Sequence, residues 1–421
     1  MARLVAPPPP GRRPSCRLCG DPLTQTFADL GASPLANRYL SADQLNDMEP
    51  FYPLRAYVCS SCLLVQLDEF ESPADIFSDY AYFASYSDSW VEHARLYTDM
   101  AIARFGLGAQ HQVIELASND GYLLQHFVAK GIPVVGIEPA ANVASEALRK
   151  GIPTLVEFFG EGMAHRLVAE GTQADLLVGN NVLAHVPALN DFIRGMALVL
   201  RRGGAITMEF PHLLKLIEGS EFDTIYHEHF SYFSLITAEK AFARHGLRLF
   251  DVEELPTHGG SLRIYASHAA DTSRPPSPRL EGLREREKAA GLHRLDLYLS
   301  FGERVKETKR RLLQFLIDAK RAGRTVVGYG APAKGNTLLN YCGVRSDFLD
   351  YTVDRSPHKQ GRFLPGTHIP IHHPDRITET KPDYVMILPW NLRDEIMSQM
   401  AHVRAWGGRF VIPVPEAIVV P

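Results

Sequence analysis

The chain has 421 residues and a formal net charge of −4, with 45% hydrophobic and 22% charged residues. This length allows two or three domains, and the composition is that of an ordinary globular protein. The slightly acidic balance excludes a whole-chain attraction to nucleic acid or to an anionic membrane, and no apolar run reaches membrane-spanning length. We therefore expect a cytoplasmic protein with no nucleic-acid partner and no membrane partner.

Four of the five cysteines form two closely spaced pairs, Cys16-x-x-Cys19 and Cys59-x-x-Cys62. Two such pairs predict a tetrahedral site in which four thiolates hold one structural zinc ion, the alternative being a redox pair. Because four thiolates leave no open position on the ion, a catalytic metal is not expected. The segment between the pairs carries more acids than bases, which argues against a nucleic-acid finger.

From residue 112 onward, short apolar runs alternate with amphipathic stretches. The runs lie at residues 112–118, 133–139, 174–183 and 205–211, and two further strand candidates lie at 247–256 and 261–268. This alternation predicts an α/β fold, a doubly wound sheet with helices on both faces.

The turn VIELASNDGYLL, residues 113–124, joins a predicted strand to the start of a helix. Gly121 lets the main chain approach a ligand closely, and Glu138 ends the next strand, where an acid can bond ribose hydroxyls. GxGxxG is absent, so the turn lacks the fingerprint of a dinucleotide site. Asn180, Asn181 and His185 follow a later strand in GNNVLAHVP; asparagine pairs also form turns, and a single histidine is often a satisfied core residue.

This pattern resembles class I S-adenosylmethionine-dependent methyltransferases. In that family the first turn faces the methionine part of the cofactor, and the acid after the second strand holds the ribose. The cofactor ligands implied by the resemblance are Glu115, Ala117, Asn119, Asp120, Gly121, Glu138, Asn180 and Asn181.

The stretch FDTIYHEHFSYFS, residues 222–234, concentrates proton-handling groups between aromatic residues. A regular strand would place His227 and His229 on one face, with Tyr226 and Glu228 on the other. The residues alone leave three interpretations: a metal site, an acid/base centre or a satisfied core.

After the six predicted strands of this unit, residues 271–279, DTSRPPSPR, break the periodicity and predict a linker. A long helix follows, with an apolar stripe at Val305, Leu312, Phe315, Leu316 and Ala319 that indicates packing. Strand–helix alternation then restarts at residues 325–330, 349–354, 384–390 and 409–415.

The second α/β unit opens with GYGAPAKGN, residues 328–336, a glycine-rich turn with Lys334 at the predicted helix start. Main-chain donors, the helix dipole and a lysine can together hold phosphate oxygens. Arg355, His358 and Lys359 follow the next strand and would form a wall of the same nucleotide pocket, although such clusters are often solvated loops.

Taken in order, these motifs, together with EFPHLLKLIEGSEFDTIYHEHFSYFS and PTHGGSLRIY, resemble nucleotide-sugar C-methyltransferases of deoxysugar biosynthesis for antibiotic glycosides. The resemblance spans almost the whole chain, apart from the proline-rich first fifteen residues. It implies four parts: a zinc-binding module at 1–75, an S-adenosylmethionine-binding domain at 76–270, a linker and long helix at 271–322, and a Rossmann-like nucleotide-sugar domain at 323–421. The implied reaction is methyl transfer to the carbon beside the ketone of a dTDP-4-keto-deoxysugar, commonly C3.

The resemblance also implies roles for single residues. His229 would remove the proton, Glu228 would orient His229 or the sugar, and Tyr226 and His185 would steady the enolate. Tyr80 would line the cleft of cofactor and sugar. The implied substrate ligands are His258, Gly260, Arg263, Tyr329, Lys334, Asn336, Arg355 and Lys359. If Glu228 and His229 serve one substrate, the backbone from Tyr226 to Phe230 should be irregular, and His227 should be structural.

Three alternatives compete with this interpretation: a NAD(P)H-dependent 4-ketoreductase, alone or as a second activity, a zinc-containing RNA methyltransferase, and a non-catalytic scaffold. C5 methylation would use similar residues. We expect a monomer that uses S-adenosylmethionine and a structural Zn²⁺.

Overall fold

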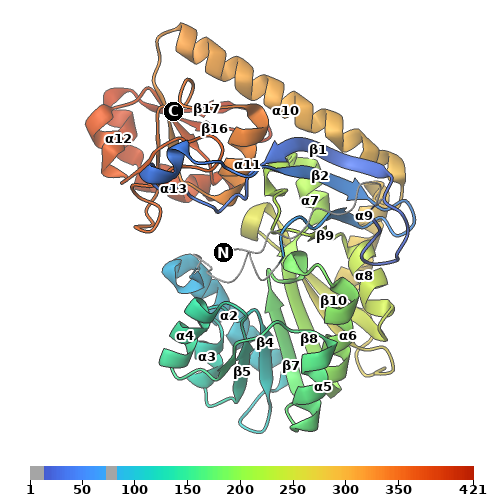
Figure 1. Cartoon of the computed structure of the whole chain (residues 1–421). Coiled ribbons are helices and arrows are strands. Elements are labelled where there is room, and N and C mark those ends of the chain that lie inside the picture. Colours follow the sequence, from blue (N-terminus) through green and yellow to red (C-terminus); the bar gives the residue numbers. More distant parts are fainter. Residues whose placement is uncertain (1–13, 73–82) are drawn as a thin grey trace.

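A computed structural model of the protein describes residues 14–72 and 83–421, and three β-sheets organise these residues (Figure 1). The first sheet belongs mainly to the N-terminal cysteine region. The second and third are the two α/β units expected from the sequence. A long helix, α10 (Leu295–Arg321), passes along the first sheet and leads from the second sheet to the third (Figure 1).

The first sheet has four antiparallel strands in the order β1-β2-β3-β9. Their bounds are Gln25–Ser33 for β1, Tyr52–Val58 for β2, Val65–Leu67 for β3 and Ser231–Tyr232 for β9. The fourth strand thus comes from a distant part of the chain, with Ser231 opposite Gln66 and Tyr232 opposite Val65. Because β9 directly follows residues 226–230, the histidine-rich stretch, that stretch is anchored on the N-terminal sheet.

The second sheet has seven strands in the order β10-β11-β8-β7-β4-β5-β6. The bounds are β4 Val113–Leu116, β5 Val134–Ile137, β6 Thr154–Leu155, β7 Ala174–Asn180, β8 Leu200–Pro211, β10 Leu247–Leu255 and β11 Ser261–His268. The five strands β4 to β8 pair in parallel, and β11 and β10 add antiparallel strands at one edge. The strand order reverses between β4 and β7, and the carboxyl ends of strands at such a reversal form the ligand site of a doubly wound sheet. The predicted doubly wound fold is confirmed.

The third sheet has six strands in the order β14-β13-β12-β15-β16-β17. The bounds are β12 Val326–Tyr329, β13 Thr352–Val353, β14 Ile371–His372, β15 Tyr384–Ile387, β16 Arg409–Ile412 and β17 Ile418–Val420. All pairs are parallel except the last, β16 with β17. Here the order reverses between β12 and β15, so the glycine-rich turn after β12 lies at a second potential ligand site.

Twelve α-helices are described in residues 83–421. They are α2 Asp88–Phe105, α3 Leu124–Val128, α4 Ala141–Arg149, α5 Glu161–Ala169, α6 Leu189–Val199, α7 Leu213–Gly219, α8 Leu235–Ala243, α9 Pro278–Ala289, α10 Leu295–Arg321, α11 Ala333–Cys342, α12 Asp375–Thr380 and α13 Arg393–Gln399. Short 3-10 helices are η1 Ala42–Asn46, η2 Ala84–Tyr86, η3 Leu183–His185, η4 Phe222–Thr224, η5 Thr257–Gly259, η6 Trp390–Leu392 and η7 Ala401–Trp406.

Several helix boundaries follow directly from the local sequence. The hydroxyl oxygens of Ser87, Ser234 and Ser277 accept hydrogen bonds from main-chain N–H groups in the first turns of α2, α8 and α9. Gly106 and Gly343 end α2 and α11 in the left-handed conformation, which glycine adopts without steric cost. None of the helices in residues 14–72 and 83–421 is long and apolar enough to cross a membrane.

The long helix α10 fixes the N-terminal sheet against the third sheet. Phe301 of α10 stacks on Phe27 of β1 with ring centroids 4.5 Å apart, and Phe315 meets Tyr384 of β15 edge-on at 5.2 Å. One hydrophobic cluster continues from β1 and β2 through α10 into α11 and β15. The two regions therefore share a core, which holds the segment between β1 and β2 next to the C-terminal unit.

Candidate active site

The four cysteines of the two N-terminal pairs come together in one cluster. The Sγ atoms of Cys16 and Cys62 are 3.4 Å apart, as are those of Cys19 and Cys59, and all four lie within 4.8 Å of one another. Four thiolates bound to one zinc ion at about 2.3 Å require sulfur separations of about this size. Gln66 Nε2 also donates to Cys16 Sγ at 3.2 Å, a bond suited to a thiolate. The donor set fits a structural zinc ion, which supports the predicted metal.

The histidine-rich stretch forms a tight turn. The N–H of His229 donates to the carbonyl oxygen of Tyr226 at 2.8 Å, with His227 and Glu228 at the corner of the turn. The backbone from Tyr226 to Phe230 is neither helix nor strand. The expectation of an irregular backbone is therefore confirmed, and the turn removes the alternation that would send Glu228 and His229 to opposite faces.

His229 is fixed in one tautomer by its surroundings. Its Nδ1 lies 2.9 Å from the carbonyl oxygen of Thr224, and a carbonyl only accepts, so Nδ1 carries the hydrogen. Nε2 is then the unprotonated nitrogen, and it makes no hydrogen bond to any residue in the described ranges. Burial holds the pKa of His229 well below its usual value, and His185 lowers it further. The imidazole is accordingly neutral and able to accept a proton.

His185 and Tyr226 complete an aromatic group around His229. The ring of His185 meets His229 edge-on with centroids 4.7 Å apart, and the Tyr226 ring lies 4.0 Å from it. His185 ends η3, after β7, so it comes from the carboxyl edge of the second sheet. Burial lowers the pKa of His185 to about 4, so this ring is also neutral. Three of the four predicted catalytic side chains thus meet directly.

The fourth predicted catalytic residue, Glu228, is buried and bonded to the N-terminal region. Asn37 Nδ2 donates to Glu228 Oε1 at 2.7 Å. Burial raises the pKa of Glu228 to about 7, and the Asn37 bond acts in the opposite direction. His227 points instead to the N-terminal sheet, where its Nε2 donates to the Pro53 carbonyl at 3.2 Å. That position suits the structural role predicted for His227.

The predicted cofactor turn has an unusual backbone held by Glu138. Ala117, Asn119 and Gly121 all have positive φ, at 54°, 51° and 77°. Glu138, just after β5, accepts from the N–H of Asn119 at 3.0 Å and from that of Ala140 at 2.9 Å. A Cβ at Gly121 would lie 2.3 Å from Ile152 Cδ1, so glycine is required both for the conformation and for the space.

The residues around this turn fit S-adenosylmethionine. Several buried polar atoms make no hydrogen bond within the described ranges: both carboxylate oxygens of Glu115, Ser118 Oγ, Asp120 Oδ1 and both side-chain polar atoms of Asn180. Buried polar atoms normally have partners, and an amine and hydroxyl groups would supply them here. Burial, with the charges of Glu138 and Asp120, raises the pKa of Glu115 well above its usual value. Tyr80, the remaining predicted cofactor ligand, lies outside the described residues.

The second and third sheets meet where Lys334 contacts His258. Lys334 Nζ donates to the His258 carbonyl at 3.2 Å and lies 4.8 Å from the centroid of the Trp390 ring. His258 has a positive φ of 57°, and its Nε2 lies 3.3 Å from the side-chain nitrogen of Asn181, a predicted cofactor ligand. The structure thus brings predicted substrate and cofactor residues to one place.

Two buried carboxylates surround Lys334. Burial raises the pKa of Glu221 to about 8 and that of Asp223 to about 6, while the Lys334 charge lowers both. Burial in turn lowers the pKa of Lys334, and the two acids oppose that effect. Trp390 Nε1 donates to Asp223 Oδ2 at 2.6 Å. Asp223 and Glu221 therefore already compensate part of the positive charge of Lys334, so that charge is not reserved for a phosphate group.

The other predicted substrate ligands of the third sheet differ in position. Lys359 donates to the Ala331 carbonyl at 2.9 Å in the glycine-rich turn, whereas Asn336 Nδ2 donates to the Ala36 carbonyl at 2.5 Å. Tyr329 is buried at the end of β12, and Arg355 is exposed after β13. Gly260 has a φ of 133°, and a Cβ there would lie 2.6 Å from Lys215 Cγ, so its contribution is steric.

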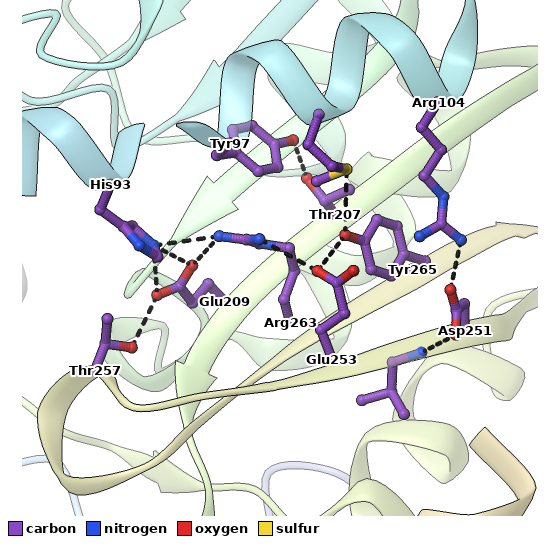
Figure 2. A network of polar contacts seen from close by, with 12 residues as sticks. His93, Tyr97, Arg104, Thr207, Glu209, Asp251, Glu253, Thr257, Arg263 and Tyr265 are labelled. Atoms are coloured by element: carbon purple, nitrogen blue, oxygen red, sulfur yellow. Dashed lines mark hydrogen bonds and ion pairs between the residues drawn. The ribbon is translucent and has the colours of Figure 1, made fainter. Parts of the chain in front are cut away.

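Arg263, predicted to bind substrate, belongs instead to a buried ion-pair network (Figure 2). Its Nη2 lies 2.8 Å from Glu209 Oε2, and its Nη1 lies 3.3 Å from Glu253 Oε2. His93 of α2 bonds the same Glu209 oxygen at 2.9 Å, and the Thr257 hydroxyl donates to Glu209 Oε1 at 3.1 Å. Because its charge is used within the protein, Arg263 holds α2 and η5 against the sheet rather than facing a ligand.

Sequence reasoning missed Asn37, Glu221, Asp223 and Trp390. The two acids stand at the edge of the histidine-rich stretch, so their spacing was a usable signal. Asn37 and Trp390 lie far from that stretch in the chain, and nothing in a single sequence indicates their contacts with Glu228 and Asp223.

Three family models match successive parts of the chain. They are described as "Putative zinc binding domain" at residues 16–77, "Methyltransferase domain" at 90–252 and "C-methyltransferase C-terminal domain" at 256–415. Among curated proteins, C-methyltransferase NovU of Streptomyces niveus is 34% identical over 405 residues, which cover 96% of this chain and 96% of NovU.

Two solved structures with a similar fold each match less than half of this chain. Magnesium protoporphyrin IX methyltransferase ChlM of Synechocystis PCC 6803, with bound S-adenosylmethionine, is 16% identical with a TM-score of 0.32 and covers 46% of this chain and 88% of ChlM. The CcbJ methyltransferase of Streptomyces caelestis is 12% identical with a TM-score of 0.35 and covers 47% of this chain and 96% of CcbJ. The similarity to NovU, the matching family models and the cysteine cluster confirm the predicted methyltransferase fold, zinc module and cofactor.

Proposed function

This chain belongs to the family of S-adenosylmethionine-dependent C-methyltransferases, and from that premise we propose that it methylates C3 of a dTDP-4-keto-deoxysugar. A C–H bond of a sugar becomes acidic enough for deprotonation only beside a carbonyl, whose oxygen takes up the enolate charge. Methylation at carbon therefore calls for a ketone in the substrate, a base, and a group that stabilises the enolate oxygen.

One observation carries the proposal: the neutral imidazole of His229, held by Thr224 so that Nε2 is the proton acceptor. In the proposed step, Nε2 takes the proton from C3, and the electrons of the C–H bond form the enolate with the C4 carbonyl. S-adenosylmethionine, when bound, would supply an electrophilic methyl group: the enolate electrons at C3 would form the new C–C bond as the S–CH3 bond breaks, and S-adenosylhomocysteine would leave with that electron pair. The proton on His229 then passes to solvent.

Tyr226 and His185 are the proposed partners of the substrate oxygens. Both rings lie against His229, so a ketone whose α-carbon meets Nε2 would place its oxygen near them. The Tyr226 hydroxyl can donate a hydrogen bond that strengthens as the oxygen becomes negative. The one N–H of neutral His185 is used on the main chain of Glu228, so its other nitrogen can accept a hydrogen bond from the sugar 3-hydroxyl. Glu228, at the adjacent corner of the turn, is proposed to orient His229 or a sugar hydroxyl.

The proposed cofactor ligands are Glu115, Ala117, Asn119, Asp120, Gly121, Glu138, Asn180 and Asn181, with Tyr80 kept as a proposal from sequence. The proposed nucleotide-sugar ligands are His258, Tyr329, Lys334, Asn336, Arg355 and Lys359. The nucleotide-sugar ligands are supported by their position: they lie near the carboxyl ends of β12 and β13, or at the contact between Lys334 and His258. We also propose that residues 1–75, 76–270, 271–322 and 323–421 act as the zinc module, cofactor domain, connecting helix and nucleotide domain of a monomer.

The proposal is tested by incubating the protein with S-adenosylmethionine and a panel of 4-keto and 4-hydroxy nucleotide sugars, followed by NMR of the products. We expect a new methyl group at C3 of a dTDP-4-keto sugar and no product from the 4-hydroxy sugars. A methyl group at C5, or methylation of oxygen, would contradict the proposed substrate carbon. Reduction of the ketone with NADPH in place of methylation would favour the reductase alternative.

A further inference from the structure

We propose that Asn37, supplied by the N-terminal zinc module, is a positioning residue of the active site that holds Glu228 as a carboxylate. This inference rests on the catalytic role proposed above for Glu228. It gives the zinc module a part in the reaction besides that of a folding unit.

The contact itself joins residues 191 positions apart. The amide nitrogen Nδ2 of Asn37 lies 2.7 Å from Glu228 Oε1, and Glu228 is only 6% exposed. An amide NH₂ only donates, and a carboxylate only accepts, so this bond favours the ionised form of Glu228 and fixes its direction. No other side chain in the described ranges donates to Glu228.

The segment that carries Asn37, residues 34–40, is fastened to the third sheet. Asn336 of α11 donates to the Ala36 carbonyl at 2.5 Å, and the Tyr39 hydroxyl donates to the Ala331 carbonyl at 2.6 Å. Leu40 and Phe363 exchange main-chain hydrogen bonds at 3.0 and 2.9 Å. Figure 1 shows this blue part of the chain beside the C-terminal unit.

The opposite partner of the contact is fastened to the same module. β9, which begins two residues after His229, pairs with β3, and the Leu67 N–H donates to the Phe230 carbonyl at 3.0 Å. The turn that bears Glu228 is thus placed by the sheet beside the cysteine cluster, whereas Asn37, between β1 and β2 of that sheet, is held by contacts with the third sheet. The N-terminal module therefore supplies Asn37 and anchors the turn, so the cofactor domain alone does not set the 2.7 Å contact.

Among the groups that face Glu228, Asn37 is the one whose hydrogen bond favours the ionised carboxylate. His185, from η3, is neutral and bonds the main chain of Glu228, not its carboxylate. The charge of Glu228 acts on Tyr39 of the N-terminal segment, as do the charges of Lys359 and Asp354, which lie 3.6 Å apart and are paired with each other. Burial raises the pKa of Glu228, and the Asn37 bond is the one effect that lowers it.

The test is a direct titration of Glu228 in the full-length zinc-loaded protein. Glutamate carboxyl carbons are labelled with ¹³C, the Glu228 signal is assigned by its loss in Glu228→Gln, and the titration is repeated in Asn37→Ala and Asn37→Asp. Loss of a hydrogen bond to a carboxylate should raise the midpoint by about one to two pH units, and a second carboxylate should raise it further. Asn37→Asp keeps the volume of the side chain, so the titration remains decisive if Asn37→Ala does not fold.

Ser41→Ala is the matched control. It removes a cap on η1 at the end of the same segment without touching Glu228, so its midpoint should equal that of the unchanged protein. An unchanged or lower midpoint in both Asn37 variants, at full zinc content, would overturn the proposal. So would an equal upward shift in Ser41→Ala, because the effect would then be a general loosening of the segment.

Kinetics separate this inference from the proposed function. Because the proposal makes ionised Glu228 the active form, methyl transfer is lost as the pH falls through the Glu228 midpoint. In Asn37→Ala this acid limb of the pH profile should therefore move to higher pH, by as much as the midpoint of the titration. If no 4-keto sugar is methylated by the unchanged protein, the proposed function fails, while the titration still decides whether Asn37 controls Glu228. If methylation occurs but its pH profile is the same in both Asn37 variants as in the unchanged protein, the positioning role is wrong and the proposed function stands.

Discussion

His229 donates a hydrogen bond from Nδ1 to the carbonyl oxygen of Thr224 at 2.9 Å, and this bond decides which nitrogen can act as a base. Thr224 ends the short helix η4, and the turn of Tyr226 to His229 follows it. The position of η4 relative to this turn therefore fixes His229 in the tautomer that carries its hydrogen on Nδ1. Burial keeps the pKa of the same ring well below its usual value, so the base is neutral at physiological pH.

His229→Ala should abolish methyl transfer, with a loss of at least about 100-fold, because general bases contribute about that much or more. Exchange of the α-proton of the 4-keto sugar with solvent deuterium should be lost as well, since exchange needs only the base. Binding of S-adenosylmethionine, measured by calorimetry, should not change. His227→Ala is the control: it removes the contact with Pro53 and should lower stability while leaving exchange intact. Exchange at the original rate in His229→Ala would rule out His229 as the base.

Glu138→Ala should weaken binding of S-adenosylmethionine by about tenfold or more, because hydrogen bonds to a carboxylate are worth about 1.5–3 kcal/mol. The substitution removes the acceptor of the Asn119 and Ala140 N–H groups and the proposed ribose ligand together. Calorimetry with the cofactor and, separately, with dTDP checks this prediction, and dTDP affinity should stay constant. Glu146→Ala, on the surface of α4 and paired with Arg149, should change neither affinity. An unaltered cofactor affinity in Glu138→Ala would contradict the assignment of this pocket.

The sequence was sufficient for the features that depend on local pattern. Apolar runs and helix stripes predicted both α/β sheets and the long helix, since the period of apolar residues reflects which face is buried. The two cysteine pairs predicted one four-thiolate cluster, because the ligand chemistry fixes the spacing within each pair. The turn at Tyr226–His229 also followed from a geometric requirement, that neighbouring side chains should serve one substrate.

What depends on contacts between distant segments could not be predicted from one sequence. The pairing of β9 with β3 uses only two residues of β9, too few for a recognisable strand pattern. The family resemblance implied that Arg263 binds substrate, yet Arg263 forms a buried ion pair with Glu209 of the neighbouring strand β8. Lys334 differs from its prediction for the same reason: the sequence suggested a cation available for phosphate, but the charges of Asp223 and Glu221 partly compensate it.

Glu221 should make the protein less stable as the pH rises from about 5 to 8. Burial raises its pKa to about 8 in the folded state, above the ordinary value of 4.5, so the folded state holds the proton more tightly than the unfolded state. The stabilisation from this proton is complete below about pH 4.5 and is lost as the pH passes 8. Glu221→Gln should therefore gain stability relative to the unchanged protein with increasing pH, by about 2 kcal/mol or more at pH 8.

Urea unfolding at pH 5, 6.5 and 8 measures this difference. Glu218→Gln, which removes a half-exposed carboxylate paired with Lys215 on α7, is the control and should give curves parallel to those of the unchanged protein. Parallel curves for Glu221→Gln would mean that Glu221 is ionised in the folded state, with Lys334 as its full counter-ion.

Removal of zinc should lower the rate of methyl transfer far more than the affinity for S-adenosylmethionine. The cysteine cluster joins the loop before β1 to the loop after β2, and the same sheet pairs through β3 with β9, next to the turn of His229. The proposed cofactor ligands instead follow β4, β5 and β7 of the second sheet. In the described residues no strand of that sheet pairs with the first sheet, and the cysteines contact the second sheet only through its hydrophobic core. After treatment with a chelator, or in Cys59→Ser, α-proton exchange should therefore be lost, while calorimetry should still detect binding of S-adenosylmethionine.

Addition of Zn²⁺ should restore exchange in the chelated protein but not in Cys59→Ser. A zinc-free protein, verified by metal analysis, that exchanges the proton at the original rate would show that the turn keeps its geometry without the module.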